Sequence, residues 1–81
     1  MQVRVILFAR FKDLAGKDQI VVSLTEEATI GDLRKTLMQI FSTAAGLLER
    51  SALAMDNEIA DNERPIRDNA EVALLPPVSG G

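Results

Sequence analysis

Few residues of this chain could carry out chemistry by the usual routes. The 81-residue sequence contains no His and no Cys. A His-based catalytic triad is therefore excluded, and a zinc site would lack its preferred ligands, so we expect no metal site. Acidic side chains are plentiful, but such groups are usually solvated, and we expect none of them to form a catalytic pair. They include Asp13, Asp18, Glu26, Glu27, Asp32, Asp56, Asp61 and Asp68.

The sequence ends in the unusual segment "LLPPVSGG", which combines two prolines with a diglycine. Pro76 and Pro77 have no backbone N–H, so they must end any strand that precedes them. Gly80 and Gly81 have no Cβ, so their backbone could thread a narrow channel. Residues 76–81 would span at most about 20 Å. We expect residues 76–81 to form a flexible tail that is presented beyond the domain. The alternative is a frayed end or a cloning remnant.

Composition limits the partners of the chain. Nine Lys and Arg against twelve Asp and Glu give a net charge of −3, and the basic residues are scattered. Nucleic acid binding needs a clustered basic surface, so we expect no nucleic acid partner. No apolar run approaches about 18 residues, and no signal peptide is recognisable, so we expect no membrane association and a cytoplasmic location.

Five short segments have the composition of strands: 3–8, 20–24, 53–55, 58–60 and 71–75. Alternation in the first segment places Val3, Val5 and Leu7 on the core face, with Ile6 and Phe8 on the opposite face. Alternation in the last segment likewise directs Val72 and Leu74 inward and leaves Ala73 and Leu75 outward. Asp56-Asn57 is a plausible hairpin turn between the third and fourth segments.

One main helix is predicted between the second and third strands. Thr29 is a suitable N-cap, and Asp32 occupies the N3 position of a capping box that begins at Thr29. Ile30, Leu33, Leu37, Ile40 and Phe41 then recur at helical spacing and define an apolar face, with Arg34 elsewhere on the wheel. Shorter helical turns are expected at 11–14, ended by Gly16, and around Leu47-Leu48.

This order predicts an α+β domain, with a mixed sheet of five strands, or four, and the main helix on one face. The first and last strands are the most apolar, so we expect them to be central and adjacent. The tail would follow this domain, which covers residues 1–75.

The segments "LFARFKDLAG" (residues 7–16) and "NAEVALLPPVSGG" (69–81), with this element order, carry a resemblance. The chain resembles the β-grasp, ubiquitin-like sulfur carriers, and among them the small-subunit family of molybdopterin synthase. That family usually has Gly-Asp or Gly-Glu before the last strand and Phe within it. Here Asn69-Ala70 and Leu74-Leu75 stand there. Asn tolerates the left-handed conformation that Gly would adopt.

The resemblance implies a carrier that is not an enzyme on its own. An E1-like activating enzyme would use ATP to adenylate Gly81, so the carrier itself needs no bound cofactor. Sulfur would replace the adenylate to give a thiocarboxylate. The large subunit, in a heterotetramer of two small and two large subunits, would use this sulfur to convert a cyclic pyranopterin monophosphate to the dithiolene of molybdopterin. The dithiolene contains two sulfurs, so two carriers would be consumed per product.

Two other readings remain open at this point. The first is a related carrier for thiamine synthesis or tRNA thiolation, or a ubiquitin-like protein modifier. The second is a β-grasp interaction module without chemistry at its tail.

A docking patch is also predicted on the sheet face away from the main helix. If the first and last strands are neighbours, Ile6, Phe8 and Leu75 converge there, bordered by Ile59. A partner that binds this patch would receive the tail residues Pro76, Pro77, Val78, Ser79, Gly80 and Gly81. The alternative is that Phe8 belongs to the core, because a slip of one residue exchanges the two faces of a strand.

Overall fold

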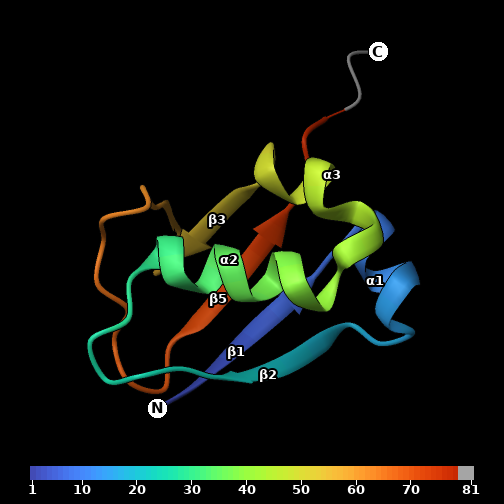
Figure 1. The fold of residues 1–81 in the computed structure, drawn as a ribbon. Coiled ribbons are helices and arrows are strands. Elements are labelled where there is room, and N and C mark those ends of the chain that lie inside the picture. The colour runs from blue at the N-terminus through green and yellow to red at the C-terminus, as the bar shows by residue number, and fades with distance from the viewer. Residues whose placement is uncertain (79–81) are drawn as a thin grey trace.

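Five strands form one mixed sheet in the computed structural model, which describes residues 1–78 (Figure 1). They are β1 (Gln2–Leu7), β2 (Gln19–Ser23), β3 (Ala52–Met55), β4 (Glu58–Ile59) and β5 (Glu71–Leu75). Their spatial order is β2-β1-β5-β3-β4, with β1 and β5 parallel and the other neighbours antiparallel. The predicted adjacency of the first and last strands is confirmed, as is the five-stranded form of the sheet.

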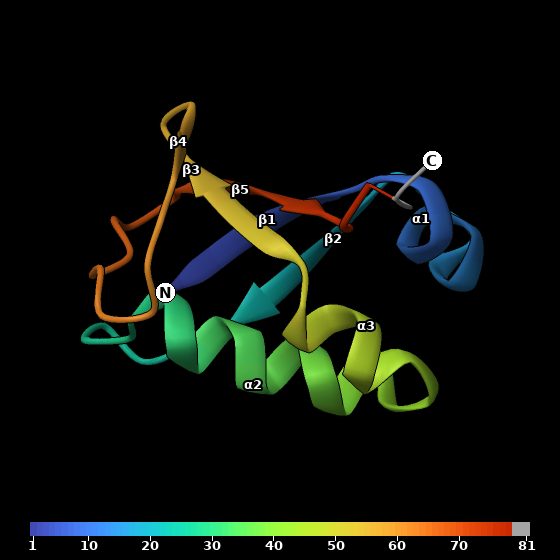
Figure 2. The same cartoon turned by 90° about the horizontal axis from the view of Figure 1, so that it is seen from above.

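Helices cover one face of this sheet. The main helix α2 (Ile30–Ile40) and the short α3 (Ala45–Glu49) lie on the same side, joined by the 3₁₀ turn η1 (Ser42–Ala44) (Figure 2). Helix α1 (Ala9–Ala15) connects β1 to β2. The predicted main helix is confirmed, and within residues 1–78 two shorter α-helices accompany it where single turns were predicted.

The start of α2 is specified by a capping box. The Thr29 hydroxyl accepts a hydrogen bond from the Asp32 backbone N–H at 3.3 Å, and the Thr29 N–H donates to the Asp32 carboxylate at 2.9 Å. The backbone hydrogen bond from Thr29 is the main reason that the pKa of Asp32 lies below its usual value. The predicted cap is confirmed.

Three turns adopt left-handed backbone angles at residues that tolerate them. Gly16 ends α1 with φ 71°, Asn69 precedes β5 with φ 59°, and Asp56 and Asn57 form the β3–β4 turn with φ 55° and 65°. Two consecutive positive φ angles are the requirement of a type I′ hairpin turn, which matches the twist of the flanking strands. The roles predicted for Gly16, Asp56-Asn57 and Asn69 are therefore confirmed.

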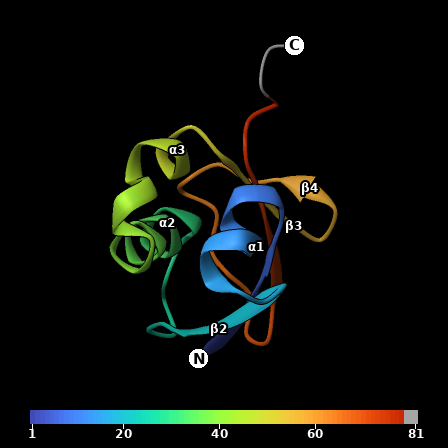
Figure 3. The same ribbon diagram turned by 90° about the vertical axis from the view of Figure 1, so that its right-hand side faces the viewer.

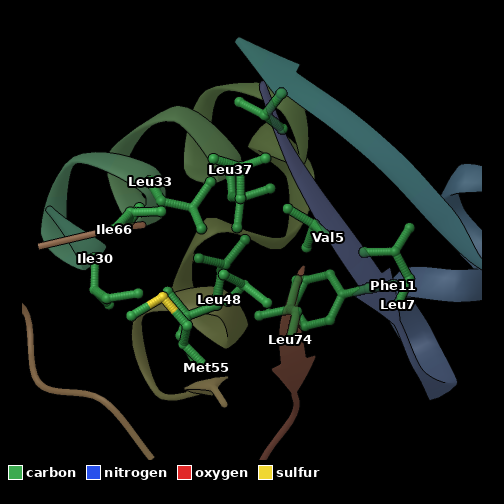
Figure 4. Packing of buried hydrophobic residues seen from close by; sticks show 14 of the residues in the cluster. Val5, Leu7, Phe11, Ile30, Leu33, Leu37, Leu48, Met55, Ile66 and Leu74 are labelled. Carbon is green, nitrogen blue, oxygen red and sulfur yellow. The ribbon is translucent and has the colours of Figure 1, made fainter. Parts of the chain in front are cut away.

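The core lies between the sheet and the helices (Figure 4). The inward residues of β1 and β5 are almost completely buried, at 0% or 1% exposure. They are Val3, Val5, Leu7, Val72 and Leu74. They meet the apolar face of α2, while Phe11 of α1 packs edge-on against Phe41, with ring centroids 5.4 Å apart. Such a pair adds about 1 kcal/mol beyond the area it buries.

One residue of the predicted helix face is placed wrongly by periodicity alone. Ile40 is 52% exposed, whereas Ile30, Leu33 and Leu37 are fully buried. Ile40 lies at the margin of the apolar stripe and is the last residue of α2, where the chain turns away into η1. Phe41, which follows it, fills the core in its place at 6% exposure.

Arg34 connects three separate segments of the chain. One terminal guanidinium nitrogen donates to the carbonyl oxygens of Leu48 at 2.9 Å and Ser51 at 2.8 Å. The Nε atom donates to the Asn62 side-chain oxygen at 3.1 Å. Arg34 thereby joins α2 to the end of α3, to the approach to β3 and to the loop that follows β4.

Replacing Arg34 by Ala is expected to lower the free energy of unfolding by about 1–3 kcal/mol, because hydrogen bonds from a charged donor to carbonyls are lost together. Arg34→Lys should recover only part of this, since an ammonium group lacks the planar fork. Urea denaturation of both variants, with Lys35→Ala as an exposed control, measures the difference. Equal stability of Arg34→Ala and Lys35→Ala would contradict a structural role for Arg34.

Candidate docking surface and tail

The sheet face away from α2 carries a continuous apolar row. Strand registers place Ile6 of β1 beside Ala73 of β5, Ala73 beside Ala54 of β3, and Ala54 beside Ile59 of β4. Residues directly opposite each other in a sheet project from the same face. We call these four residues the outer strip. Ile59 is 67% exposed and the other three are partly exposed, so the strip is open to solvent.

Phe8 and Leu75 extend this surface toward the carboxyl end of β5. Leu7 pairs with Leu74 in the parallel register, so the next residues, Phe8 and Leu75, are neighbours beyond it. Phe8 keeps an extended backbone and is 44% exposed, whereas Leu7 is 1% exposed. The predicted phase of the first strand is therefore confirmed, and the alternative that places Phe8 in the core is wrong.

The tail leaves the sheet beside this surface. Pro76 directly follows β5 and is partly buried, whereas Pro77 is exposed. Val78 is 94% exposed, and residues 76–78 run away from the domain beyond the end of β5 (Figure 1). The remaining predicted tail residues, Ser79, Gly80 and Gly81, lie outside the described residues.

Charged pairs border the apolar surface at its other end. Arg4 and Glu71 are opposite each other at the beginning of β5, and their side chains approach to 3.6 Å. At the β3–β4 hairpin, Asp56 accepts a hydrogen bond from Arg67 at 2.7 Å, and Arg64 lies 3.7 Å from Asp56. These half-exposed pairs contribute little to stability. Their effect is to confine the apolar area to the end from which the tail leaves.

The β3–β4 hairpin forms a raised rim of this surface. Figures 2 and 3 show it projecting on the side opposite α2 and α3. The hairpin carries Ile59, so this side chain stands at the edge of the outer strip. The structure thus brings together the predicted patch residues of β1 and β5, and it places the predicted Ile59 at the far end of the same row.

Two features of the surface were not foreseen from the sequence. Ala54 occupies the middle of the outer strip, and its position between the large residues Leu53 and Met55 is the signal that could have identified it. Ala9 has φ 51°, a left-handed conformation that costs a non-Gly residue roughly 1–2 kcal/mol. It turns the chain from β1 into α1 immediately after Phe8. No feature of the sequence predicts this angle.

Other kinds of site find no support in residues 1–78. In that part of the chain, no cluster of three or more His, Cys, Asp or Glu side chains could hold a metal ion. None of the helices described is long and apolar enough to span a membrane.

Comparison with known proteins bears on the whole length of the chain. The family model described as the ThiS family matches residues 5–81. The chain belongs to the ThiS family. As a member of this family, it is also similar to the molybdopterin synthase sulfur carrier subunit of Dictyostelium discoideum. The two are 37% identical, over 99% of this chain and 96% of that protein. The similarity to the small-subunit family that the sequence indicated is therefore confirmed.

Solved structures confirm the β-grasp, ubiquitin-like fold. SAMP1 from Haloferax volcanii superimposes with a TM-score of 0.83 at 25% identity, over 100% of both chains. A chain from the complex of subunits 1 and 2 of the molybdopterin-converting factor of Helicobacter pylori gives a TM-score of 0.69 at 24% identity, again over 100% of both chains. At this identity the second likeness concerns the fold alone.

Proposed function

We propose that this ThiS-family chain is the sulfur-carrier small subunit of molybdopterin synthase. The observation that carries the proposal is the 37% identity with the Dictyostelium sulfur carrier subunit over nearly the whole of both proteins. The family match extends through the diglycine to residue 81, so it includes the segment that would carry the sulfur. The chain would supply sulfur and would not be an enzyme by itself.

The proposed chemistry takes place at the Gly81 carboxylate. A carboxylate is a poor electrophile, because its leaving group would be an oxide. An E1-like enzyme would transfer AMP from ATP to one carboxylate oxygen, releasing pyrophosphate. A sulfur nucleophile at the oxidation level of sulfide would then attack the acyl carbon, and AMP would leave with its oxygen. The product is a thiocarboxylate, in which one oxygen of Gly81 has been replaced by sulfur. No cofactor bound to this chain is required.

The thiocarboxylate would act inside the large subunit of the synthase. There it would donate its sulfur to a cyclic pyranopterin monophosphate, and two carriers would be needed to form the dithiolene. In the Helicobacter pylori complex, subunits 1 and 2 of the converting factor assemble with each other. We propose that this chain assembles likewise with a large subunit, in a heterotetramer of two small and two large chains.

The outer strip, with Phe8 and Leu75, is the proposed contact surface for the large subunit. A partner that covers its partly exposed apolar side chains would remove them from water, which favours binding. Since Leu75 directly precedes Pro76, a large subunit that covers this surface would bind the chain where the tail begins. Proline at positions 76 and 77 limits the conformations of the first tail residues, which reduces the entropy lost when the tail enters a partner. We assign Pro76, Pro77, Val78 and Ser79 to this contact.

Intact-mass analysis tests the carrier chemistry. After incubation with ATP, the activating enzyme and a sulfur donor, the protein should gain the mass difference of one oxygen-to-sulfur exchange. Fragmentation should place the change at Gly81. A sulfur adduct that persists after Gly81 has been removed would falsify this assignment.

A protein modifier is the second candidate. The supporting observation is the likeness to SAMP1, an archaeal small modifier protein, over the whole of both chains. A modifier would form an amide bond between Gly81 and a lysine of another protein, whereas a carrier would leave the terminus free. Denaturing electrophoresis of cell extracts, probed for this chain, separates the two. A ladder of conjugates that disappears when Gly81 is deleted would favour the modifier.

A further inference from the structure

Within residues 1–78, strand β2 pairs with β1 on one side and leaves its other edge unpaired. The Leu7 N–H donates to the Asp18 carbonyl at 2.9 Å, and the Leu24 N–H donates to the Met1 carbonyl at 2.9 Å. Backbone groups of an antiparallel strand point alternately to either side, so those of Ile20 and Val22 also face β1. The N–H and C=O groups of the alternate residues, 19, 21 and 23, therefore point away from the sheet. Figure 1 shows β2 as the outermost strand on its side.

The two edges of the sheet differ in how they are protected. At the other edge, β4 has only two residues, and Glu58 lies 3.7 Å from Arg64, so charge and shortness discourage pairing. Strand β2 has five residues, with the sequence QIVVS, which contains no charge and no Pro. Its Val21 side chain is 56% exposed. Such a strand is suited to pair with another strand.

We propose that the β2 edge binds the β2 edge of a second copy of this chain, in antiparallel orientation. A two-fold axis through Val21 would place Val21 opposite Val21 of the second copy, and Gln19 opposite Ser23. The outward groups of these residues would then bond to each other. Three residue pairs with two hydrogen bonds each give about six bonds across the edge. The two sheets would join into a single continuous sheet.

Charge at the ends of β2 favours a second copy in this orientation. Lys17 and Asp18 precede the strand and together carry no net charge, whereas Glu26 and Glu27 follow it, and all four are exposed. An antiparallel pair brings the end of each copy that carries Lys17 to the glutamate end of the other. A parallel pair would instead place the two negatively charged glutamate ends together. Glu26 also lies 3.5 Å from the N-terminal ammonium group, which leaves Glu27 as the more available partner for Lys17.

This pairing would leave the proposed docking surface open. A two-fold axis perpendicular to the sheet keeps the outer strips of both copies on the same side. The tail follows β5, which is separated from β2 by β1. Both copies could therefore still present their tails while joined through β2. The inference concerns a different part of the sheet and does not rest on the proposed function.

Sedimentation equilibrium tests the pairing with the variant Val21→Glu. Val21 lies opposite Arg4 within the monomer, so a glutamate there faces an opposite charge and should not disturb folding. In the dimer, the two glutamates would face each other across the axis. We expect the wild-type chain to dimerise reversibly, with a dissociation constant below about 1 mM. Val21→Glu should raise the dissociation constant about fivefold or more. Ile40→Glu, with a similarly exposed residue at 52%, should leave it unchanged.

Amide hydrogen exchange identifies the edge that pairs. The N–H groups of residues 19, 21 and 23 should exchange rapidly in dilute protein and slowly in concentrated protein, with no such change in Val21→Glu. The proposal is overturned if the wild-type chain remains monomeric up to about 1 mM. This holds even if a strand of a different protein can bind the edge and protect these amides. The proposal is also overturned by a dimer in which these three amides remain unprotected, or by a dimer that Ile40→Glu disrupts as strongly as Val21→Glu.

Discussion

Deletion of Gly81 is expected to abolish sulfur transfer and to leave the stability of the domain unchanged. The proposed thiocarboxylate forms on this residue, so its removal shifts the reactive carbon by one residue within the active site of the partner. The tail contributes little to folding, because Pro77 and Val78 are already exposed, the latter at 94%. Loss of one residue that follows these exposed positions should change the free energy of unfolding by less than about 0.5 kcal/mol. A synthase assay and a thermal melt on the same protein measure both effects.

A chain extended by one residue beyond Gly81 is a second variant that tests the same chemistry. It keeps every native residue but removes the free carboxylate from Gly81, so it should be equally inactive and equally stable. Full activity of either variant would contradict the proposed chemistry. A large fall in melting temperature after the deletion would instead show that the tail is part of the folded domain.

Phe8→Asp and Ile59→Asp should each weaken binding to the large subunit by at least about thirtyfold, which corresponds to about 2 kcal/mol. Each replacement would place a carboxylate inside a contact from which water is excluded, where an unpaired charge is costly. In the free protein both positions are exposed, at 44% and 67%, so the new charge remains solvated there. Calorimetric titration against the large subunit, with a denaturation curve for each variant, gives the affinity and the stability.

Ile40→Asp is the control for these two variants. Ile40 has comparable exposure, at 52%, but belongs to α2 on the other side of the sheet. It should bind the large subunit as the wild-type chain does. The outer strip would lose its proposed role if Phe8→Asp and Ile59→Asp also bound normally, or if Ile40→Asp weakened binding to the same extent.

Several parts of the fold could be predicted because they depend on residues close together in the chain. The capping box needs only Thr29 and Asp32, and the hairpin turn needs only Asp56 and Asn57, which tolerate positive φ angles. The faces of β1 and β5 follow from simple alternation, so the outward positions of Phe8 and Leu75 were predictable. The tail was recognised for the same local reason, since Pro76 and Pro77 cannot continue a strand.

The candidate docking surface could be predicted only in part. Its β1 and β5 members followed from alternation and from the expectation that the two most apolar strands lie together. The position of Ala54 between Ala73 and Ile59 required the register of β3 against β5 and β4. Such a register is set by contacts between segments that are distant in the chain, and local periodicity does not contain it.

The sequence by itself determined the strands, the main helix, the buried faces of β1 and β5 and the turn residues, because these depend on local periodicity and on backbone preferences. Only the tertiary structure decided the roles of Arg34, Ile40 and β2. Arg34 finds its carbonyl partners in segments that folding brings to α2. Ile40 is exposed because the chain turns away at the end of that helix. Strand β2 is an open edge because β1 has its other side occupied by β5, which comes from the far end of the chain.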